Sequence, residues 1–188
     1  MTFNFTRLSL PDVVLIQPTR YDDDRGFFSE TFRASAFEQY VRDPFVQDNL
    51  ARSTAGVLRG LHFQLDPKAQ GKLIQVVGGE IYDVAVDVRR SSPTFGRWVG
   101  TALSAETGHM LWVPPGFAHG YVVTSDGADV AYKVTAEYEP ALDRGIRWDD
   151  PDIGIEWPNL GPIGPKDPIV SEKDRALPLL SEAETLFE

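Results

Sequence analysis

The chain has 188 residues and a mass of 20.9 kDa, the size of one domain with a substantial hydrophobic core. Hydrophobic residues make up 42% and charged residues 24% of the sequence, which excludes a disordered protein. The formal net charge of −10 disfavours a general nucleic-acid binder, and the absence of cysteine excludes thiol nucleophiles, disulfides and cysteine-based zinc sites.

The N-terminal residues show no apolar run behind a basic start, so we expect no signal peptide. No stretch approaches the length of a membrane span. The expectation is therefore a cytoplasmic protein that binds neither a membrane nor nucleic acid. Because no repeat or linker composition marks a boundary, the sequence predicts a single domain over residues 1–188.

The first predicted element is a short helix. Ser35 and Glu38 fit the capping box that begins many helices. Phe37, Tyr40 and Val41 supply an apolar stripe, and Pro44 ends the pattern.

Short strands separated by clusters of Gly, Pro, Asp and Ser dominate the rest of the chain. The predicted strands are Val57–Leu65, Lys72–Val77, Ile81–Val88, Trp98–Leu103, Met110–Val113, Gly120–Thr124 and Val130–Ala136. Ile81–Val88 is mostly apolar, which is typical of a strand buried on both faces. This spacing indicates a β-sandwich or barrel. Residues 149–188 are rich in Pro and Gly and are predicted to be a wrapping tail with one or two short helices.

The sequence contains three histidines, His62, His109 and His119, and any reaction that needs an imidazole must use one of them. The segment Gly108–His119 matches the pattern G-x5-P-x-G-x2-H without a gap, and Gly56–His62 matches G-x5-H. Both patterns resemble the two motifs of the cupin superfamily. The resemblance implies an all-β cupin jelly-roll barrel (a double-stranded β-helix) with a few short peripheral helices.

The metal ligands of the superfamily are incomplete in this chain. Gln64 stands where the first motif has its second histidine, no glutamate follows at the required spacing, and Val123 replaces the asparagine of the second motif. Two imidazoles without a carboxylate make a poor site for a divalent transition metal, which needs three or four such ligands. We therefore expect no metal, and the polar turn after Gly108 predicts a structural rather than a chemical role for His109.

A closer resemblance is carried by a series of blocks in one order. They are residues 24–30 (DRGFFSE), 45–49 (FVQDN), 57–64 (VLRGLHFQ), 70–73 (QGKL), 82–87 (YDVAVD), 92–96 (SPTFG), 115–120 (PGFAHG), 132–133 (YK), 154–158 (GIEWP) and 171–174 (SEKD). In this respect the chain resembles the dTDP-4-dehydrorhamnose 3,5-epimerases over nearly its whole length.

The resemblance implies epimerisation at C3 and C5 of dTDP-4-dehydro-6-deoxy-D-glucose to give dTDP-4-dehydro-L-rhamnose, on the route to dTDP-L-rhamnose. Both carbons flank the C4 ketone, so the reaction needs a base, a group that stabilises the enolate oxygen, and an acid on the opposite face. No cofactor is expected, since the sequence contains neither a dinucleotide-binding nor a P-loop motif.

The same resemblance assigns roles to individual residues. His62 suits the base, because imidazole exchanges protons near neutral pH. Asp174 is implied as its orienting carboxylate and Tyr132 as the acid. Lys72 and Arg59 are candidates for charge stabilisation of the enolate or the diphosphate. Binding of the sugar is implied for one further residue, His119.

The family positions that hold or border the nucleotide end are Arg25, Glu30, Gln47, Asn49, Asp143 and Lys173. A diphosphate calls for cationic donors, and arginine binds it in a bidentate manner. Two departures affect this end. Asp143 is shorter than the glutamate that the family often has, and Glu137 replaces an aromatic residue of some members.

One feature of the first segment conflicts with these roles. In a regular strand over Val57–Leu65, Arg59 and His62 would face opposite sides. Either a bulge at Gly60 brings both side chains to one site, or one of them reaches the site from the rim or from another subunit.

Three alternatives remain open from sequence. They are a 5-epimerase or 3-epimerase of another dTDP-ketodeoxysugar, a non-catalytic sugar-nucleotide-binding cupin, and a metal-dependent cupin oxygenase or isomerase, which Gln64 disfavours. The family resemblance also implies a homodimer, in which Arg25 and Glu30 could serve a neighbouring subunit's site.

Overall fold

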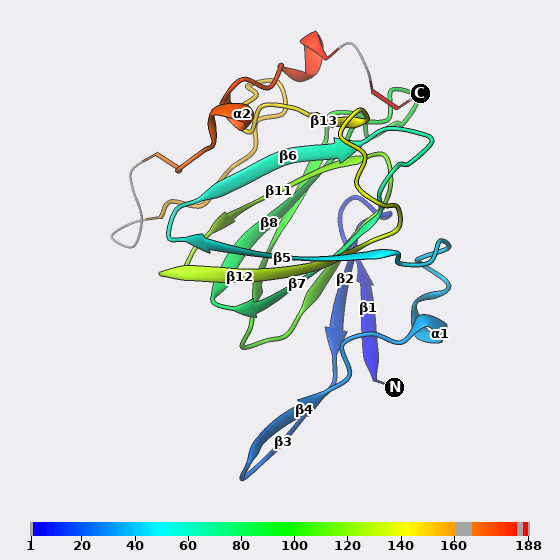
Figure 1. Ribbon diagram of the computed structural model, residues 1–188, viewed down its shortest axis with the longest axis vertical. Coiled ribbons are helices and arrows are strands. Elements are labelled where there is room, and N and C mark those ends of the chain that lie inside the picture. Colours follow the sequence, from blue (N-terminus) through cyan, green and yellow to red (C-terminus); the bar gives the residue numbers. More distant parts are fainter. Residues whose placement is uncertain (1, 161–166, 184–185, 188) are drawn as a thin grey trace.

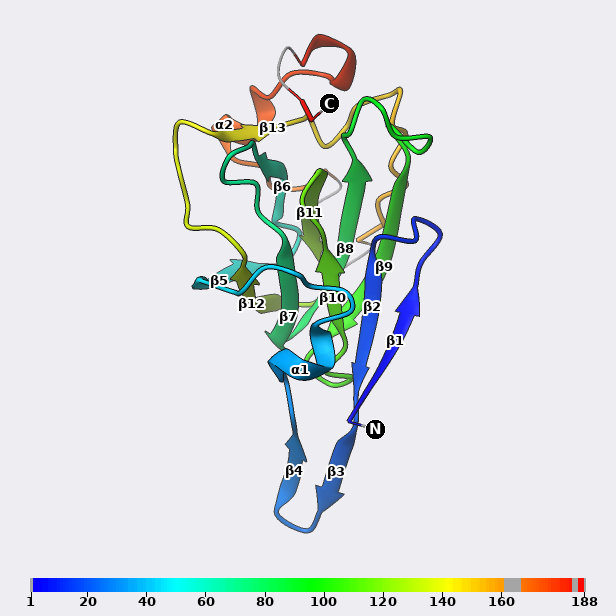
Figure 2. The ribbon, with the colours of Figure 1, turned by 90° about the vertical axis from the view of Figure 1, so that its right-hand side faces the viewer.

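The computed structural model describes residues 2–160, 167–183 and 186–187 and is built mainly of antiparallel strands (Figures 1 and 2). The strands are β1 (Phe3–Arg7), β2 (Val14–Pro18), β3 (Arg20–Asp23), β4 (Gly26–Ser29), β5 (Gln47–Thr54), β6 (Leu58–Gln64), β7 (Lys72–Gly78), β8 (Glu80–Asp87), β9 (Trp98–Ser104), β10 (Met110–Val113), β11 (Phe117–Val123), β12 (Gly127–Val134) and β13 (Asp143–Gly145). The helices are α1 (Ala34–Phe37), α2 (Glu172–Arg175) and a 3-10 turn, η2 (Leu180–Glu182).

Two large sheets form the body of the barrel. One has the strand order β1-β2-β10-β7-β12-β5 and the other the order β13-β6-β11-β8-β9. Non-consecutive neighbours in both sheets are what a jelly roll requires, and they confirm the predicted all-β fold. Hydrophobic side chains from both sheets, such as Ile74, Ala85, Leu111 and Val130, form a core between them.

The outer faces of the two sheets are also covered. Residues that follow β13, among them Ile146, Ile153 and Leu180, pack on the outer face of the five-stranded sheet. Phe37 and Val41, in and after α1, pack against β1, β2 and β10 on the other sheet. Double coverage explains why β8 is buried along almost its whole length, as predicted for Ile81–Val88.

The helix prediction was right about position and wrong about capping. Helix α1 ends at Phe37, well before Pro44, and its N-cap is Arg33, which makes no side-chain capping hydrogen bond. Ser35 therefore lies inside the helix, and the capping box at Ser35 and Glu38 does not form. Packing of Phe37 against the sheet, rather than capping, holds this turn in place.

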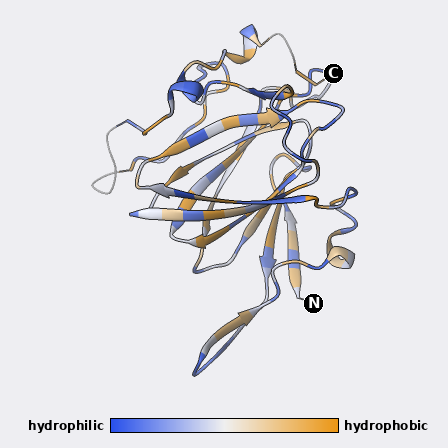
Figure 3. Ribbon diagram, viewed as in Figure 1, coloured by the Kyte–Doolittle hydropathy of each residue, from blue (hydrophilic) through white to orange (hydrophobic). Residues whose placement is uncertain are grey.

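The small hairpin of β3 and β4 extends away from the barrel (Figures 1 and 2). Its aromatic side chains are exposed: Tyr21 is 55%, Phe27 58% and Phe28 71% accessible. Figure 3 shows β4 as a hydrophobic strand although it is uncovered. Large apolar groups gathered in this way mark an interaction surface more often than an ordinary surface.

Candidate active site

A cavity of about 680 Å³ opens between the two sheets and under α2. Ten of the twelve predicted site residues line it, and they come from β5, β6, β7, β11, β12, β13 and the α2 region: Gln47, Asn49, Arg59, His62, Lys72, His119, Tyr132, Asp143, Lys173 and Asp174. The structure thus brings together residues that are far apart in the sequence.

A β-bulge at Gly60 resolves the conflict between Arg59 and His62. Arg59 is paired with Tyr121 and His62 with His119, so two residues of β6 lie opposite the single Gly120 of β11. Both side chains consequently reach the cavity. Gly60 has a φ of +126°, and a Cβ there would lie 2.5 Å from the Cα of Gly120, which explains why glycine occupies the bulge.

His62 and Asp174 form the hydrogen-bonded pair that the resemblance leads us to expect. Nε2 of His62 and Oδ1 of Asp174 are 2.6 Å apart, and the backbone N–H of Asp174 donates to Oγ of Ser171, which caps α2. Burial is the largest single influence on the pKa of Asp174 and raises it, but the lowering effects of His62, Gly60 and Ser171 together hold that pKa below its ordinary value. An ionised Asp174 accepts the proton on Nε2, so Nδ1 of His62 carries the free lone pair.

Lys72 is the buried cation of the cavity. It is 8% exposed, and its Nζ donates to the backbone oxygen of His62 at 3.1 Å. Burial lowers the pKa of Lys72 to about 8, against the opposing charges of Asp143 and Asp83. The ammonium group is therefore easily discharged, a property of lysines that work in catalysis.

Tyr132 lies on β12, in the sheet opposite the one that carries His62. Burial raises the pKa of Tyr132, although the charge of Arg59 opposes this effect. The phenol is thus neutral near pH 7 and able to donate a proton. The candidate acid and base approach the cavity from opposite walls.

His119 is fixed by a carboxylate that the sequence analysis missed. Its Nε2 lies 2.9 Å and 3.1 Å from the two oxygens of Asp83, which is fully buried on β8. The segment 82–87 looks like an ordinary buried strand, so no local pattern pointed to this inward-facing carboxylate. A second missed residue is Tyr138, whose hydroxyl donates to Oδ2 of Asp143 at 3.1 Å on the cavity wall. It is the aromatic neighbour of Glu137.

Gln64, which replaces a superfamily metal ligand, is occupied in holding the backbone. Its Nε2 donates to the carbonyl oxygens of Lys68 and Glu137, and its Oε1 accepts from the N–H of Glu139 at 2.8 Å. Within the described ranges, no three or more His, Cys, Asp or Glu side chains are grouped as a metal site would require. The donor set at this position does not fit a cupin metal.

Arg25 and Glu30 do not line the cavity of their own chain. Arg25 lies at the tip of the β3–β4 hairpin, where its guanidinium pairs with Asp23. Glu30 follows β4, and its carboxylate lies 3.8 Å from Arg33. The predicted site residues therefore fall into two groups: ten line the cavity of the barrel, and Arg25 and Glu30 lie on or next to the hairpin.

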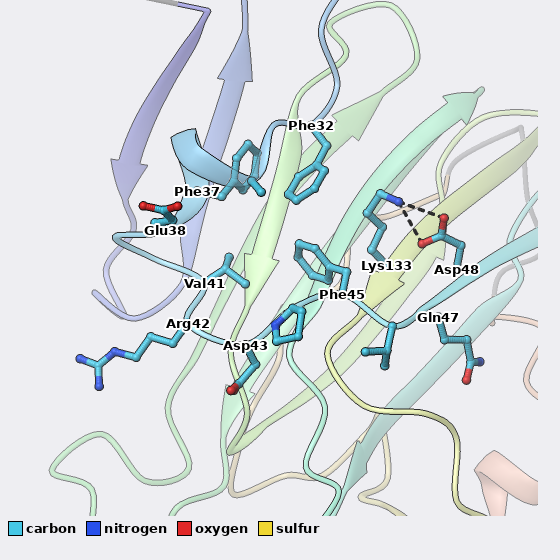
Figure 4. A pocket seen from close by; sticks show the side chains of 13 residues that line it. Phe32, Phe37, Glu38, Val41, Arg42, Asp43, Phe45, Gln47, Asp48 and Lys133 are labelled. Carbon is cyan, nitrogen blue, oxygen red and sulfur yellow. Dashed lines mark hydrogen bonds and ion pairs between the residues drawn. The ribbon is translucent and has the colours of Figure 1, made fainter.

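A second cavity, of about 640 Å³, lies between α1 and the start of β5 (Figure 4). Phe32 and Phe45 form an aromatic wall, and Lys133 at its edge is paired with Asp48 at 2.9 Å. It shares Gln47 with the first cavity and contains neither histidine nor tyrosine. None of the twelve predicted site residues except Gln47 lines this second cavity.

Comparison with known proteins agrees with this geometry. A family model described as dTDP-4-dehydrorhamnose 3,5-epimerase matches residues 7–182. The protein of that name from Shigella flexneri is 51% identical over 173 residues, which cover 91% of this chain and 92% of the relative. This chain belongs to the dTDP-4-dehydrorhamnose 3,5-epimerase family.

Solved structures of the family superpose closely. A Legionella pneumophila epimerase in complex with dTDP-4-keto-L-rhamnose is 44% identical, with a TM-score of 0.90 over 97% of this chain and 95% of that one. A 3′-monoepimerase from Streptomyces bikiniensis in complex with dTDP-quinovose is 34% identical, with a TM-score of 0.85 over 94% and 88%. None of the helices in the described ranges is both long and apolar enough to cross a membrane.

Proposed function

We propose that this chain is a metal-independent epimerase, acting in the cytoplasm, that inverts C3 and C5 of dTDP-4-dehydro-6-deoxy-D-glucose to form dTDP-4-dehydro-L-rhamnose. The observation that carries the proposal is the arrangement of His62, paired with Asp174, on one wall of the cavity and Tyr132 on the opposite wall. Inversion at a carbon requires a base and an acid on opposite faces of the intermediate.

Each inversion proceeds in two proton transfers. Nδ1 of His62 removes the proton from the carbon next to the ketone, and the electron pair moves onto the C4 oxygen as an enolate. The ammonium group of Lys72 stabilises this charge in the buried cavity. Tyr132 then donates its proton to the opposite face of the carbon, and the ketone reforms. Proton exchange with solvent then returns the tyrosinate to the phenol and the imidazolium to the neutral imidazole.

The nucleotide end has two groups of candidate ligands. Gln47, Asn49, Asp143 and Lys173 line the cavity, where Nζ of Lys173 donates to Oδ2 of Asp143 at 2.6 Å. Arg25 and Glu30 lie on the hairpin outside it. Because the hairpin exposes Tyr21, Phe27 and Phe28, the proposal includes a homodimer in which each hairpin covers the partner and brings Arg25 and Glu30 to the partner's nucleotide.

The narrower alternative is inversion at a single carbon, which the likeness to a 3′-monoepimerase supports. Incubation with dTDP-4-dehydro-6-deoxy-D-glucose in deuterated water, followed by NMR, separates the two. Deuterium at both C3 and C5 is the expected result. Deuterium at one carbon would establish the narrower activity, and none at either carbon would refute the epimerase and favour a binding protein. Activity is expected to survive removal of metals with a chelator, and a need for added metal would refute the metal-independent route.

A further inference from the structure

Tyr121 is a cavity residue that none of the roles above uses. It lies on β11, two residues after His119, and is 4% exposed. Its ring packs in the core between the sheets, and its side chain lines the same cavity as His62 and Tyr132. Among the buried side-chain polar atoms of the described residues, its hydroxyl oxygen is the one that has no hydrogen-bond partner.

The surroundings of this hydroxyl place it among the groups that line the cavity. In the strand register Tyr121 lies directly opposite Arg59 on β6 and Asp83 on β8, so the three side chains share one face. Ser53 is also near: its Oγ accepts from Nε of Arg59 at 3.0 Å, and its proximity lowers the pKa of Tyr121, but it does not meet the geometry of a hydrogen bond to the phenol. Burial raises the pKa of Tyr121, so the phenol is neutral and carries a proton to donate.

A buried hydroxyl without a partner destabilises a fold, because its hydrogen bonds to water are lost and not replaced. Phenylalanine would fill the same space without that cost. In a cavity that accepts a polar ligand, an unpaired donor is best explained by a partner that arrives with the ligand. On β6 and β11 the pair His62–His119 is the neighbour of the pair Arg59–Tyr121. Because both histidines are assigned to the reacting sugar, the sugar is the part of the ligand that would lie nearest to Tyr121.

We propose that Tyr121 is a substrate-binding residue whose hydroxyl donates a hydrogen bond to an oxygen of the sugar, an inference that rests on the proposed function. A neutral donor suits a ketone or hydroxyl oxygen, whereas the diphosphate calls for the cations of the site.

The test compares Tyr121→Phe with the matched control Tyr82→Phe, which removes a phenol hydroxyl outside the cavity on the neighbouring strand β8. Affinities for dTDP-glucose and for dTDP are measured by calorimetry, together with kcat/KM. We expect Tyr121→Phe to weaken dTDP-glucose about tenfold, lower kcat/KM at least as much, and leave dTDP unchanged. Tyr82→Phe should change none of these.

The melting temperature of Tyr121→Phe separates a binding role from a purely structural one, because loss of a structural hydroxyl would lower it. Tyr121→Phe is expected to melt at the same or a higher temperature than the parent chain. Unchanged affinity for dTDP-glucose, an equal loss for dTDP, or a clear drop in melting temperature would each overturn the proposal. Because binding is measured without turnover, an inactive parent chain would refute the proposed function and not this assignment.

Discussion

Nε2 of His62 lies 2.6 Å from Oδ1 of Asp174, a residue 112 positions further along the chain. The pair joins the barrel to the helix α2 that covers it, and it leaves Nδ1 of His62 free to accept a proton. The half-exposed His62 is therefore held in one orientation by a carboxylate that is almost fully buried.

Removal of the base should abolish the reaction without unfolding the barrel. We expect His62→Ala to lower kcat by a factor of about 100 to 10,000, the usual contribution of a general base. His109→Ala is the matched control, since His109 lies outside the cavity, and it should keep full activity. Turnover is followed by NMR and folding by circular dichroism. Normal turnover in His62→Ala would remove His62 from this role.

The pKa of Lys72, about 8, predicts an alkaline limit to activity. The ammonium group is present below that pH and is lost above it, so kcat should fall about tenfold per pH unit well above pH 8. Lys72→Met should be weakly active and should lack this alkaline limb. A pH profile of kcat from 6 to 10 for both proteins makes the comparison. If kcat of Lys72→Met falls above pH 8 as it does in the parent chain, the alkaline limit belongs to the titration of another group.

The same pKa shift affects stability with a definite sign. Because the folded-state pKa lies below the usual 10.5, the unfolded chain binds more protons between about pH 8 and 10.5. The cost of burying the ammonium group is therefore relieved as the pH rises through this window. Relative to Lys72→Met, the parent chain should gain free energy of unfolding there, as urea titrations at several pH values would show.

Gly60 should be intolerant of any side chain. In Gly60→Ala the new Cβ would lie 2.5 Å from the Cα of Gly120 and 2.8 Å from the backbone oxygen of His119, so the strands must separate. We expect a loss of more than about 2 kcal/mol in the free energy of unfolding, together with loss of activity.

Gly108→Ala is the control for Gly60→Ala. Gly108 also has a positive φ, of +64°, but its Cβ would meet nothing closer than Pro18 at 3.8 Å. A cost of about 1 kcal/mol is expected from the backbone conformation alone. Equal losses in the two variants would show that crowding at the bulge is unimportant.

The homodimer proposal predicts complementation between two inactive proteins. Arg25→Ala should weaken nucleotide binding, and His62→Ala lacks the base. If Arg25 serves the partner's site, a mixed dimer contains one site with both residues, and mixing the two variants after dissociation should restore part of the activity. No recovery, despite mixed dimers detected by mass spectrometry, would place Arg25 in its own subunit's site.

Sequence and structure agree most closely where apolar periodicity is strong. The predicted strand Met110–Val113 matches β10, and Lys72–Val77 matches β7 to within one residue. Strand β5 was missed because Gln47–Thr54 is an edge strand with mostly polar side chains, half-buried only on the cavity side. The pattern of residues along one strand does not show which of its polar side chains will line a cavity.

The site was predictable chiefly through the family resemblance. No periodicity connects Asp174 to His62, since the contact depends on how the tail returns to the barrel. Asp83 and Tyr121 lie within segments that look like ordinary buried strands, and only packing shows that their polar atoms face inward. The bulge at Gly60 was one of two geometric solutions, and the structure shows that it is the one used.

The position of Asp174 in the chain also orders events during protein synthesis. Every strand that the structure describes, from β1 to β13, precedes α2 and leaves the ribosome first. Until α2 has also been synthesised, His62 has no access to the carboxylate that pairs with it. The contact between His62 and Asp174 can form only when the tail folds back onto the barrel, so it is made after every strand of the barrel has been synthesised.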